Sequence, residues 1–311
     1  MKIQGQAEQV TEQNYFASFD YLIGGLLINV NNDISSVQQQ GGKEEFMRFI
    51  HPGSSPDADI QVSMECTSRK DDTITGGDAI FSGNNCKFLA REDAFQFLRF
   101  WGEEQEKPFL VVQTDSLFSV FHYRFQQDAA KIHPIDPYRS AAESLLLQHS
   151  FINHKGIIIH AGGGSVQGKG IVFAGTSGAG KSTLSELLSA SPDNRLYSDE
   201  RLVIRFVDEQ WNLWGTPWQG TGNIARNETS PLSALVFLRQ AEKTQITELS
   251  PSAGLHRLLQ VVSIPWYSAE WTNKGLAVCE SLIQDIPMFE LAFRPDQTAV
   301  DAVEEWAMKL S

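Results

Sequence analysis

The residues with the clearest chemical potential form one short glycine-rich segment in the second half of the chain. It reads G-T-S-G-A-G-K-S and fits the phosphate-binding P-loop pattern G-x-x-x-x-G-K-[ST] without a mismatch. An apolar run at residues 170–174 precedes it, and a run with leucines on one helical face follows at residues 182–190. The predicted nucleotide-binding residues are therefore Gly175, Thr176, Ser177, Gly178, Ala179, Gly180, Lys181, Ser182 and Thr183.

Each residue type in this segment suits an anionic ligand. Glycines permit backbone dihedrals that turn successive N–H groups toward a phosphate, and the N-terminus of the following helix adds a favourable dipole. Lys181 is then expected to reach the outer phosphates, and the Ser182 hydroxyl is expected to coordinate Mg²⁺. We therefore expect ATP and Mg²⁺ as cofactors, with the choice between ATP and GTP left open.

Phosphate chemistry at a P-loop also needs an acidic group, and its place in this chain is unusual. The buried-type strand expected at residues 231–238 is followed by Arg239, so it lacks the acid that normally ends such a strand. Two adjacent carboxylates, Asp199 and Glu200, instead come soon after the P-loop helix. Neighbouring side chains on an extended segment point to opposite sides, so one carboxylate can face a metal and the other an acceptor.

Missing motifs narrow the class of nucleotide-binding protein. The chain has no N-K-x-D sequence of a GTPase, no L-S-G-G-Q of a transporter ATPase and no H-R-D or D-F-G of a eukaryotic-type protein kinase. Those three large classes are therefore disfavoured.

Composition limits the partners. The chain has 311 residues, is 41% hydrophobic and carries a net charge of -13, which argues against nucleic acid or an anionic membrane as main partner. Its first residues are too polar for a signal peptide, and no apolar run approaches about 18 residues. We expect a cytoplasmic protein whose three cysteines, Cys66, Cys86 and Cys279, are reduced and buried. A homo-oligomer is left open.

Two closely spaced prolines near residues 134–137 predict a boundary between two domains. Residues 1–137 are expected to form a smaller α+β domain without a chemical motif, and residues 138–311 a P-loop domain. The overall fold class is predicted to be α/β, with helices against a mixed sheet.

Hydrophobic periodicity places the main elements. Paired glycines at residues 24–25 indicate a hairpin or bulge, and residues 93–101 fit a helix by spacing but a strand by their aromatic content. A second hairpin is predicted with arms at 156–161 and 171–174 and a turn at 162–170. Helices are expected at 139–152, 251–262 and 296–310, the last with Asp296 as its N-cap.

These motifs together resemble a known family. A histidine that ends a strand (His160), a P-loop beginning 15 residues later, and an R-L-x-x-D-[DE] segment after the P-loop helix are similar to the kinase domain of bacterial HPr kinase/phosphorylase. That domain shares its fold with ATP-dependent phosphoenolpyruvate carboxykinase. The resemblance covers roughly residues 145–240 by its specific motifs, and the family's usual Asp-Asp pair is Asp199-Glu200 here.

The resemblance implies roles for individual residues. Asp199 would accept the proton of the acceptor hydroxyl, Glu200 would help hold Mg²⁺ together with Ser182, and His160 would lie beside the phosphates. Lys181 would act on the transferred phosphoryl group. Two residues of a later glycine- and tryptophan-rich turn, Thr216 and Gln219, are further candidates for lining the site, as is Arg226 for its positive charge.

The expected function is transfer of the γ-phosphoryl group of ATP to a hydroxyl of a protein or peptide, such as a serine. The chain looks most like diverged HPr-kinase-like proteins, some of which phosphorylate ribosomal peptides. Two alternatives stay open: a kinase that acts on a small-molecule hydroxyl, and a nucleotide-binding module without catalytic activity that senses ATP or assembles with partners.

Overall fold

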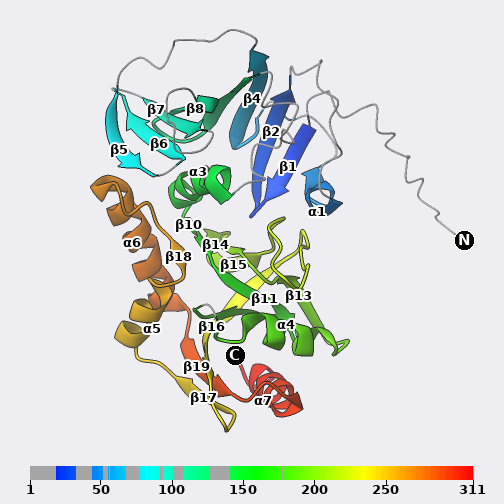
Figure 1. Cartoon of the computed structure of the whole chain (residues 1–311). Coiled ribbons are helices and arrows are strands. Elements are labelled where there is room, and N and C mark those ends of the chain that lie inside the picture. The colour runs from blue at the N-terminus through cyan, green and yellow to red at the C-terminus, as the bar shows by residue number, and fades with distance from the viewer. Residues whose placement is uncertain are drawn as a thin grey trace, which may run out of the picture.

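The structure is a computed structural model, and it describes residues 19–32, 44–51, 55, 57–67, 77–83, 85–91, 94–100, 108–126, 141–176 and 178–310. It has a mixed α/β fold with two mixed sheets (Figure 1). The helices are α1 (Glu44–Met47), α3 (Ala141–Asn153), α4 (Lys181–Ser189), α5 (Pro251–Leu258), α6 (Ala269–Asp285) and α7 (Gln297–Ala307).

The first sheet is built from the N-terminal part of the chain. Its strands are β1 (Phe19–Ile23), β2 (Leu26–Asn32), β3 (Ile50–His51), β4 (Ile60–Thr67), β5 (Asp78–Ser82), β6 (Cys86–Ala90), β7 (Ala94–Phe100), β8 (Pro108–Asp115) and β9 (Val120–Gln126). They lie in the order β3-β1-β2-β4-β9-β8-β7-β6-β5. Among its described strands only the pairs β2–β4 and β4–β9 are parallel, so the sheet is mainly antiparallel.

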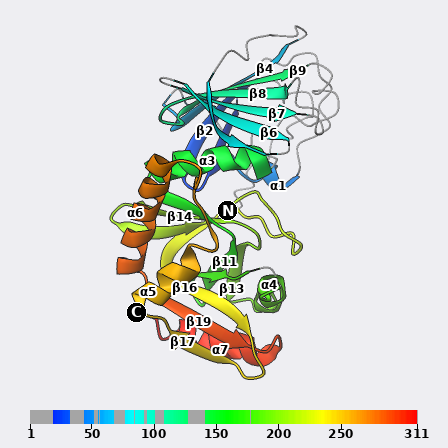
Figure 2. The ribbon, with the colours of Figure 1, turned by 60° about the vertical axis from the view of Figure 1, so that its left-hand side comes forward.

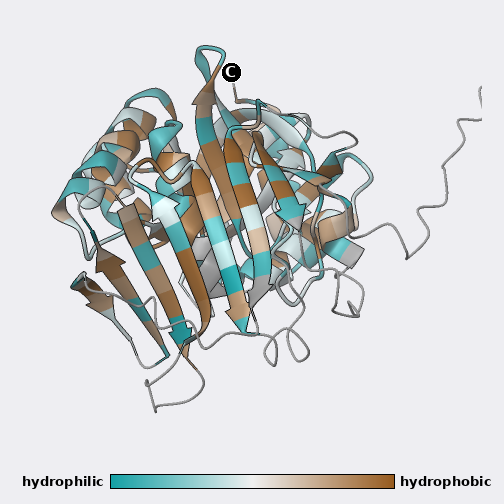
Figure 3. Cartoon of the chain, turned by 90° about the horizontal axis from the view of Figure 1, so that it is seen from above, coloured by the Kyte–Doolittle hydropathy of each residue, from teal (hydrophilic) through white to brown (hydrophobic). Residues whose placement is uncertain are grey.

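The alternation of buried and exposed side chains along the strands explains why this sheet forms. In β9 the side chains of Phe121, Tyr123 and Phe125 are buried, whereas the residues between them are at least partly exposed. Brown and teal bands follow one another along the strands in Figure 3, the pattern of strands with one covered face. The aromatic segment that fitted a helix or a strand is the strand β7. Phe95 and Phe97 pack in the same core as β9, whereas Leu98 and Phe100 pack in a separate small cluster.

Helix α3, predicted at residues 139–152, lies between the two sheets (Figure 1, Figure 2). Its Ser150 hydroxyl donates to the carbonyl of Phe118 at 2.6 Å in the β8–β9 turn. His149 is fully buried, stacks on Phe118 with ring centroids 4.0 Å apart, and meets the edge of Trp271 on α6. One apolar core is therefore shared by the first sheet, α3 and the start of the second sheet.

The β1–β2 hairpin provides a second contact between the sheets. Its turn is formed by Gly24 and Gly25 with φ of 58° and 71°, a left-handed conformation that favours glycine. A Cβ on Gly24 would lie 2.7 Å from the Phe151 ring. The Arg205 guanidinium of the second sheet donates to the Gly24 carbonyl at 2.9 Å. The turn is thus a packing point as well as a reversal of the chain.

The second sheet occupies the C-terminal part of the chain. Its strands are β10 (Gly156–Ile159), β11 (Ala161–Val166), β12 (Lys169–Ala174), β13 (Asn194–Ser198), β14 (Leu202–Val207), β15 (Gln210–Trp214), β16 (Thr229–Gln240), β17 (Gln245–Glu248), β18 (Val262–Ser263) and β19 (Met288–Phe293). The main path runs β13-β11-β12-β16-β15-β14-β10-β18, and β19 pairs with both β16 and β17.

Helices cover both faces of this sheet (Figure 2). Alternate residues of β12 point to opposite sides, with Val172 in the core beneath α5 and α6 and Phe173 in the core beneath α4 and α7. Asp296 caps α7, as predicted, because its carboxylate accepts from the Thr298 N–H at 3.0 Å. Helix α6 was not predicted, although Trp271, Gly275, Cys279 and Leu282 form a buried stripe at helical spacing.

The predicted hairpin at residues 156–174 differs from the observed one. The arms are β11 and β12, joined by a tight turn at Gln167 and Gly168, whereas β10 pairs with β14 and β18. Residues 162–164, predicted as turn, lie inside β11. Their glycines are required by close packing, because a Cβ on Gly162 would meet the Ser185 hydroxyl at 2.8 Å and one on Gly164 would meet the Arg195 carbonyl at 2.2 Å.

The predicted domain boundary at residues 137 and 138 lies outside the described residues, so the division of the chain stays a prediction. Among the segments that the structure describes, no helix combines the length and the apolar character needed to cross a membrane.

Close packing at Gly164 gives a test of this fold. Gly164→Ala should lower the free energy of unfolding by roughly 1–3 kcal/mol, because the added methyl pushes β13 away from β11. Gly168→Asn is the matched control, since its position in the turn is open and asparagine tolerates a φ of 78°. Urea unfolding of the two variants measures the difference. Equal stabilities would contradict the observed register.

Candidate functional site

The strand directions bring the P-loop and the two carboxylates to one edge of the second sheet. β11 is antiparallel to both β12 and β13, so β12 and β13 run in the same direction. β12 ends at Ala174, directly before the P-loop, and β13 ends at Ser198, directly before Asp199 and Glu200. The predicted order of strand, loop and helix is confirmed by β12 and α4.

The P-loop backbone has the conformation that its glycines allow. Gly178 and Gly180 have φ of 80° and 100°, and Gly180 is the N-cap of α4 with no side-chain hydrogen bond to the helix. The first-turn N–H groups of α4 therefore receive no acceptor from a capping side chain. Thr176, Ser182 and Thr183 are exposed, while Gly175 is buried at the strand end. Ser177 lies outside the described residues.

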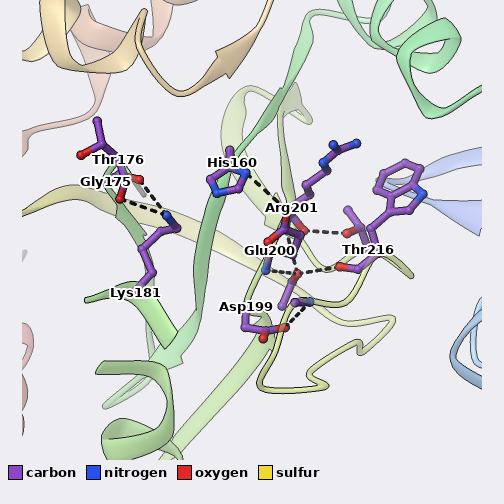
Figure 4. A network of polar contacts seen from close by, with 11 residues as sticks. His160, Gly175, Thr176, Lys181, Asp199, Glu200, Arg201 and Thr216 are labelled. Carbon is purple, nitrogen blue, oxygen red and sulfur yellow. Dashed lines mark hydrogen bonds and ion pairs between the residues drawn. The ribbon is translucent and has the colours of Figure 1, made fainter. Parts of the chain in front are cut away.

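Lys181 points back into its own loop (Figure 4). Its ammonium donates to the carbonyl of Gly175 at 2.8 Å and to that of Thr176 at 3.4 Å, and the residue is only 9% exposed. Burial lowers the pKa of Lys181, and the nearby negative charge of Glu200 partly offsets this shift. The amine is thus held close to the P-loop backbone by two neutral carbonyl acceptors, which a stronger anion can replace.

Asp199 is buried and holds a loop. One carboxylate oxygen accepts from the Gly220 N–H at 3.0 Å and the Ile224 N–H at 3.3 Å, and the other accepts from the Gly222 N–H at 2.5 Å. The residue is 2% exposed. Both oxygens are therefore engaged by the segment 220–224, which we call the glycine loop.

Glu200 faces a different set of partners. Its carboxylate lies 3.5 Å from Nδ1 of His160. Burial lowers the pKa values of His160, Lys181 and Arg201, and the negative charge of Glu200 partly offsets each of these shifts. The backbone carbonyl of Glu200 accepts from the N–H of Ala161 at 3.1 Å. These contacts place Glu200 among three basic groups at the P-loop edge of the sheet (Figure 4).

His160 sits at the break between β10 and β11, which pair with different strands of the curved sheet. The backbone N–H of His160 donates to the Val261 carbonyl at 2.8 Å. Burial lowers the pKa of His160 below its ordinary value of 6.5, as do Lys181 and Arg201, whereas Glu200 raises it. The imidazole is therefore neutral at pH 7. The pKa of this imidazole is higher in the unfolded chain than in the folded protein, so the unfolded chain is protonated first as the pH falls. Protonation of His160 therefore lowers the free energy of unfolding as the pH falls below 6.5.

The Ser182 hydroxyl is exposed at the start of α4, where a metal ligand was predicted. It lies 3.2 Å from the hydroxyl of Thr221 in the glycine loop. No cluster of three or more His, Cys, Asp or Glu side chains able to hold a metal occurs among the described residues. The Ser182 hydroxyl and the Glu200 carboxylate are ligand types that suit Mg²⁺, an ion that commonly takes its remaining ligands from water and phosphate oxygens.

Strand β16 confirms that no acid lies at the end of the neighbouring strand. It runs parallel to β12, and its last residues are Arg239 and Gln240. Arg239 pairs with Glu290 on β19 at 2.9 Å, and the amide of Gln240 donates to the Gly178 carbonyl at 2.8 Å. Strand β16 therefore supplies no acid to this edge, whereas Asp199 and Glu200 directly follow the end of β13.

Sequence reasoning found the P-loop but missed the contacts of the glycine loop. Thr216, considered for lining the site, is fully buried and donates to the Arg201 carbonyl at 2.6 Å. The side-chain amide of Gln219 donates within the turn, to the Asn223 carbonyl at 3.4 Å. The repeated glycines of G-T-P-W-Q-G-T-G were the available signal, because a Cβ on Gly220 or Gly222 would lie 2.8 Å from Asp199 Oδ2.

The fold and the site define a mixed α/β protein with a P-loop sequence at the C-terminal end of a central strand. A family model described as SynChlorMet cassette protein ScmC matches residues 139–294, half of the chain, and the protein belongs to this family. The match covers α3 and the second sheet through β19. No curated protein sequence matches the chain.

One solved structure with similarity is the HPr(Ser) kinase/phosphatase from Coxiella burnetii. It is 12% identical, with a TM-score of 0.28, over 49% of this chain and 93% of that chain. At this TM-score the similarity does not establish a common fold. The resemblance to HPr kinase therefore stays a prediction from the motifs.

The electrostatic contact between Glu200 and His160 can be measured directly. Glu200→Gln should lower the pKa of His160 further, because the substitution removes the charge that raises it. NMR titration of the imidazole signals, with His160→Gln for assignment, gives this pKa. Glu242→Gln is the control, since Glu242 is an exposed acid in the turn before β17. An unchanged or higher His160 pKa in Glu200→Gln would contradict the arrangement.

Proposed function

We propose that this protein transfers the γ-phosphoryl group of ATP to a hydroxyl group of a protein or peptide. The observation that carries the proposal is the meeting of the P-loop with Glu200 and His160 at the edge where β12 and β13 end. Phosphoryl transfer needs positioning and charge neutralisation more than covalent help from the protein. This edge brings together backbone amides, two carboxylates and basic groups that are distant in the sequence.

The described residues fit the phosphates of ATP. α4 begins at a glycine without a side-chain cap, so its first-turn amides suit an anion. Lys181 would exchange the carbonyls of Gly175 and Thr176 for phosphate oxygens. Bound Mg²⁺ would neutralise charge on the phosphates, and Ser182 and Glu200 are the residues that would hold it.

The two carboxylates take different tasks in this proposal. Glu200 faces the P-loop side, next to His160 and Lys181. Asp199 fixes the glycine loop beside Ser182 through its contacts with Gly220, Gly222 and Ile224. The predicted role of Asp199 as the base for the acceptor hydroxyl requires one of its oxygens to leave these amides. Neutral His160 would supply a hydrogen-bonding ring beside the phosphates.

Phosphate transfer into an extract of the host cell tests the proposal. The protein is incubated with Mg²⁺ and ATP labelled at the γ-phosphate, and the extract is separated into protein, peptide and metabolite fractions. Label should enter the protein or peptide fraction, and Lys181→Met should reduce it about 100-fold through loss of phosphate stabilisation. Lys309→Met, an exposed lysine on the last turn after α7, is the control.

The outcomes separate the alternatives. Label confined to the metabolite fraction would contradict a protein or peptide acceptor and indicate a small-molecule kinase. ATP binding without label in any fraction, with equal behaviour of the unmutated protein and Glu200→Gln, would contradict catalysis and favour a nucleotide-binding module.

A further inference from the structure

A polar pocket of about 530 Å³ opens beside the P-loop helix. One wall is the exposed face of α4, with Ser182, Glu186 and Ser189, and the opposite wall is formed by residues 221–226. Arg48, just after α1 of the first sheet, completes the lining. Because Ser182 belongs both to the P-loop and to the pocket, the pocket lies next to the end of the nucleotide site where metal and phosphates are expected.

The charges of the lining favour an anion. Arg48 and Arg226 contribute two positive charges and Glu186 one negative charge, and most other lining groups are polar. Within the described part of the chain, Arg226 forms no ion pair, and its backbone N–H is held by the Tyr197 carbonyl at 2.8 Å. A planar guanidinium in such a position suits a carboxylate ligand, which it can bind through two hydrogen bonds.

The pocket is built by contacts between distant segments. The exposed Arg48 side chain donates to the Ala225 carbonyl at 3.1 Å. This hydrogen bond connects the segment after α1 to the pocket wall formed by residues 221–226. Asp199 fixes the same wall from behind through Gly220, Gly222 and Ile224. Thr221 links it to Ser182. The wall at residues 221–226, the Arg48 side chain and the backbone of Arg226 are therefore held in place by the fold.

We propose that this pocket is the acceptor subsite and that it selects an acceptor with a carboxylate close to the phosphorylated hydroxyl. The inference rests on the proposed kinase function and extends it by naming the acceptor chemistry. The hydroxyl lies at the Ser182 end, and the carboxylate is bound by Arg226 and Arg48. A free hydroxy amino acid and a serine between acidic residues of a peptide share this chemistry. The first sheet thereby acquires a role in acceptor recognition.

Peptide binding tests the subsite without relying on catalysis. Fluorescein-labelled heptapeptides with a central serine flanked by glutamate, alanine or lysine are titrated by anisotropy against the full chain with Mg²⁺ and a non-hydrolysable ATP analogue. The glutamate peptide should bind about tenfold more tightly than the alanine peptide. Arg226→Ala and Arg48→Ala should each remove most of this preference, whereas Lys243→Ala, an exposed charge outside the pocket, should preserve it.

Competition then identifies the source of the acceptor. Displacement of the glutamate peptide by free L-serine would support a metabolite acceptor, and displacement only by unlabelled glutamate peptide would support a peptide acceptor. Equal binding of the three peptides, or a preference that survives both arginine substitutions, would overturn the proposal. Circular dichroism of the variants checks that each one folds.

The two proposals fail in different ways. If the glutamate peptide binds through the arginines but γ-labelled ATP transfers no label to any acceptor, the kinase function fails while the anion-selective pocket stands. If all three peptides are labelled equally, the kinase function stands and the subsite assignment fails.

Discussion

The candidate site depends on one buried carboxylate and the three backbone amides that satisfy it. A buried charge without hydrogen bonds is strongly unfavourable, and Asp199 meets this constraint through Gly220, Gly222 and Ile224. Hydrogen bonds to a charged group contribute roughly 1.5–3 kcal/mol each. The end of β13, the glycine loop and the P-loop serine are consequently held in one arrangement, and no bulkier residue fits where the two glycines approach Asp199.

The second constraint is the close packing of β11 against its neighbours. The glycines at residues 162–164 let β13 and α4 approach the strand, which brings the carboxylates to the same edge as the P-loop. The break at His160 lets the chain pass from one part of the curved sheet to the other. The Gly24 turn and α3 pack against the second sheet. The first sheet therefore contributes to the packing of the sheet that carries the site.

Local signals were sufficient for part of this structure. The P-loop, the strand before it and the helix after it follow from glycine spacing and apolar periodicity, and Asp296 was recognised as a cap from its position. The run of three glycines predicts a turn but lies in β11, because glycine marks both turns and crowded strands and only the fold distinguishes them. In helix α6 the local signal is the stripe of buried residues at helical spacing from Trp271 to Leu282.

Long-range contacts account for what the sequence did not predict. Asp199 is 21 to 25 residues from the amides that it accepts, and Arg48 is 177 residues from the carbonyl that it contacts. Adjacent carboxylates predict that two groups face different sides, but not that one of them is enclosed by a loop. The assignments of Lys181, Ser182, Glu200 and His160 to phosphate chemistry remain predictions that this geometry supports.

Hydrogen exchange of the glycine loop measures the constraint on which the site depends. The amides of Gly220, Gly222 and Ile224 should exchange slowly in the unmutated protein and much faster in Asp199→Asn. In that variant the side-chain NH₂ group replaces one carboxylate oxygen and cannot accept a hydrogen bond from the backbone N–H that faces it. Asp193→Asn, in the exposed turn before β13, should leave their exchange unchanged. Equal protection of the loop amides in Asp199→Asn and the unmutated protein would contradict the account.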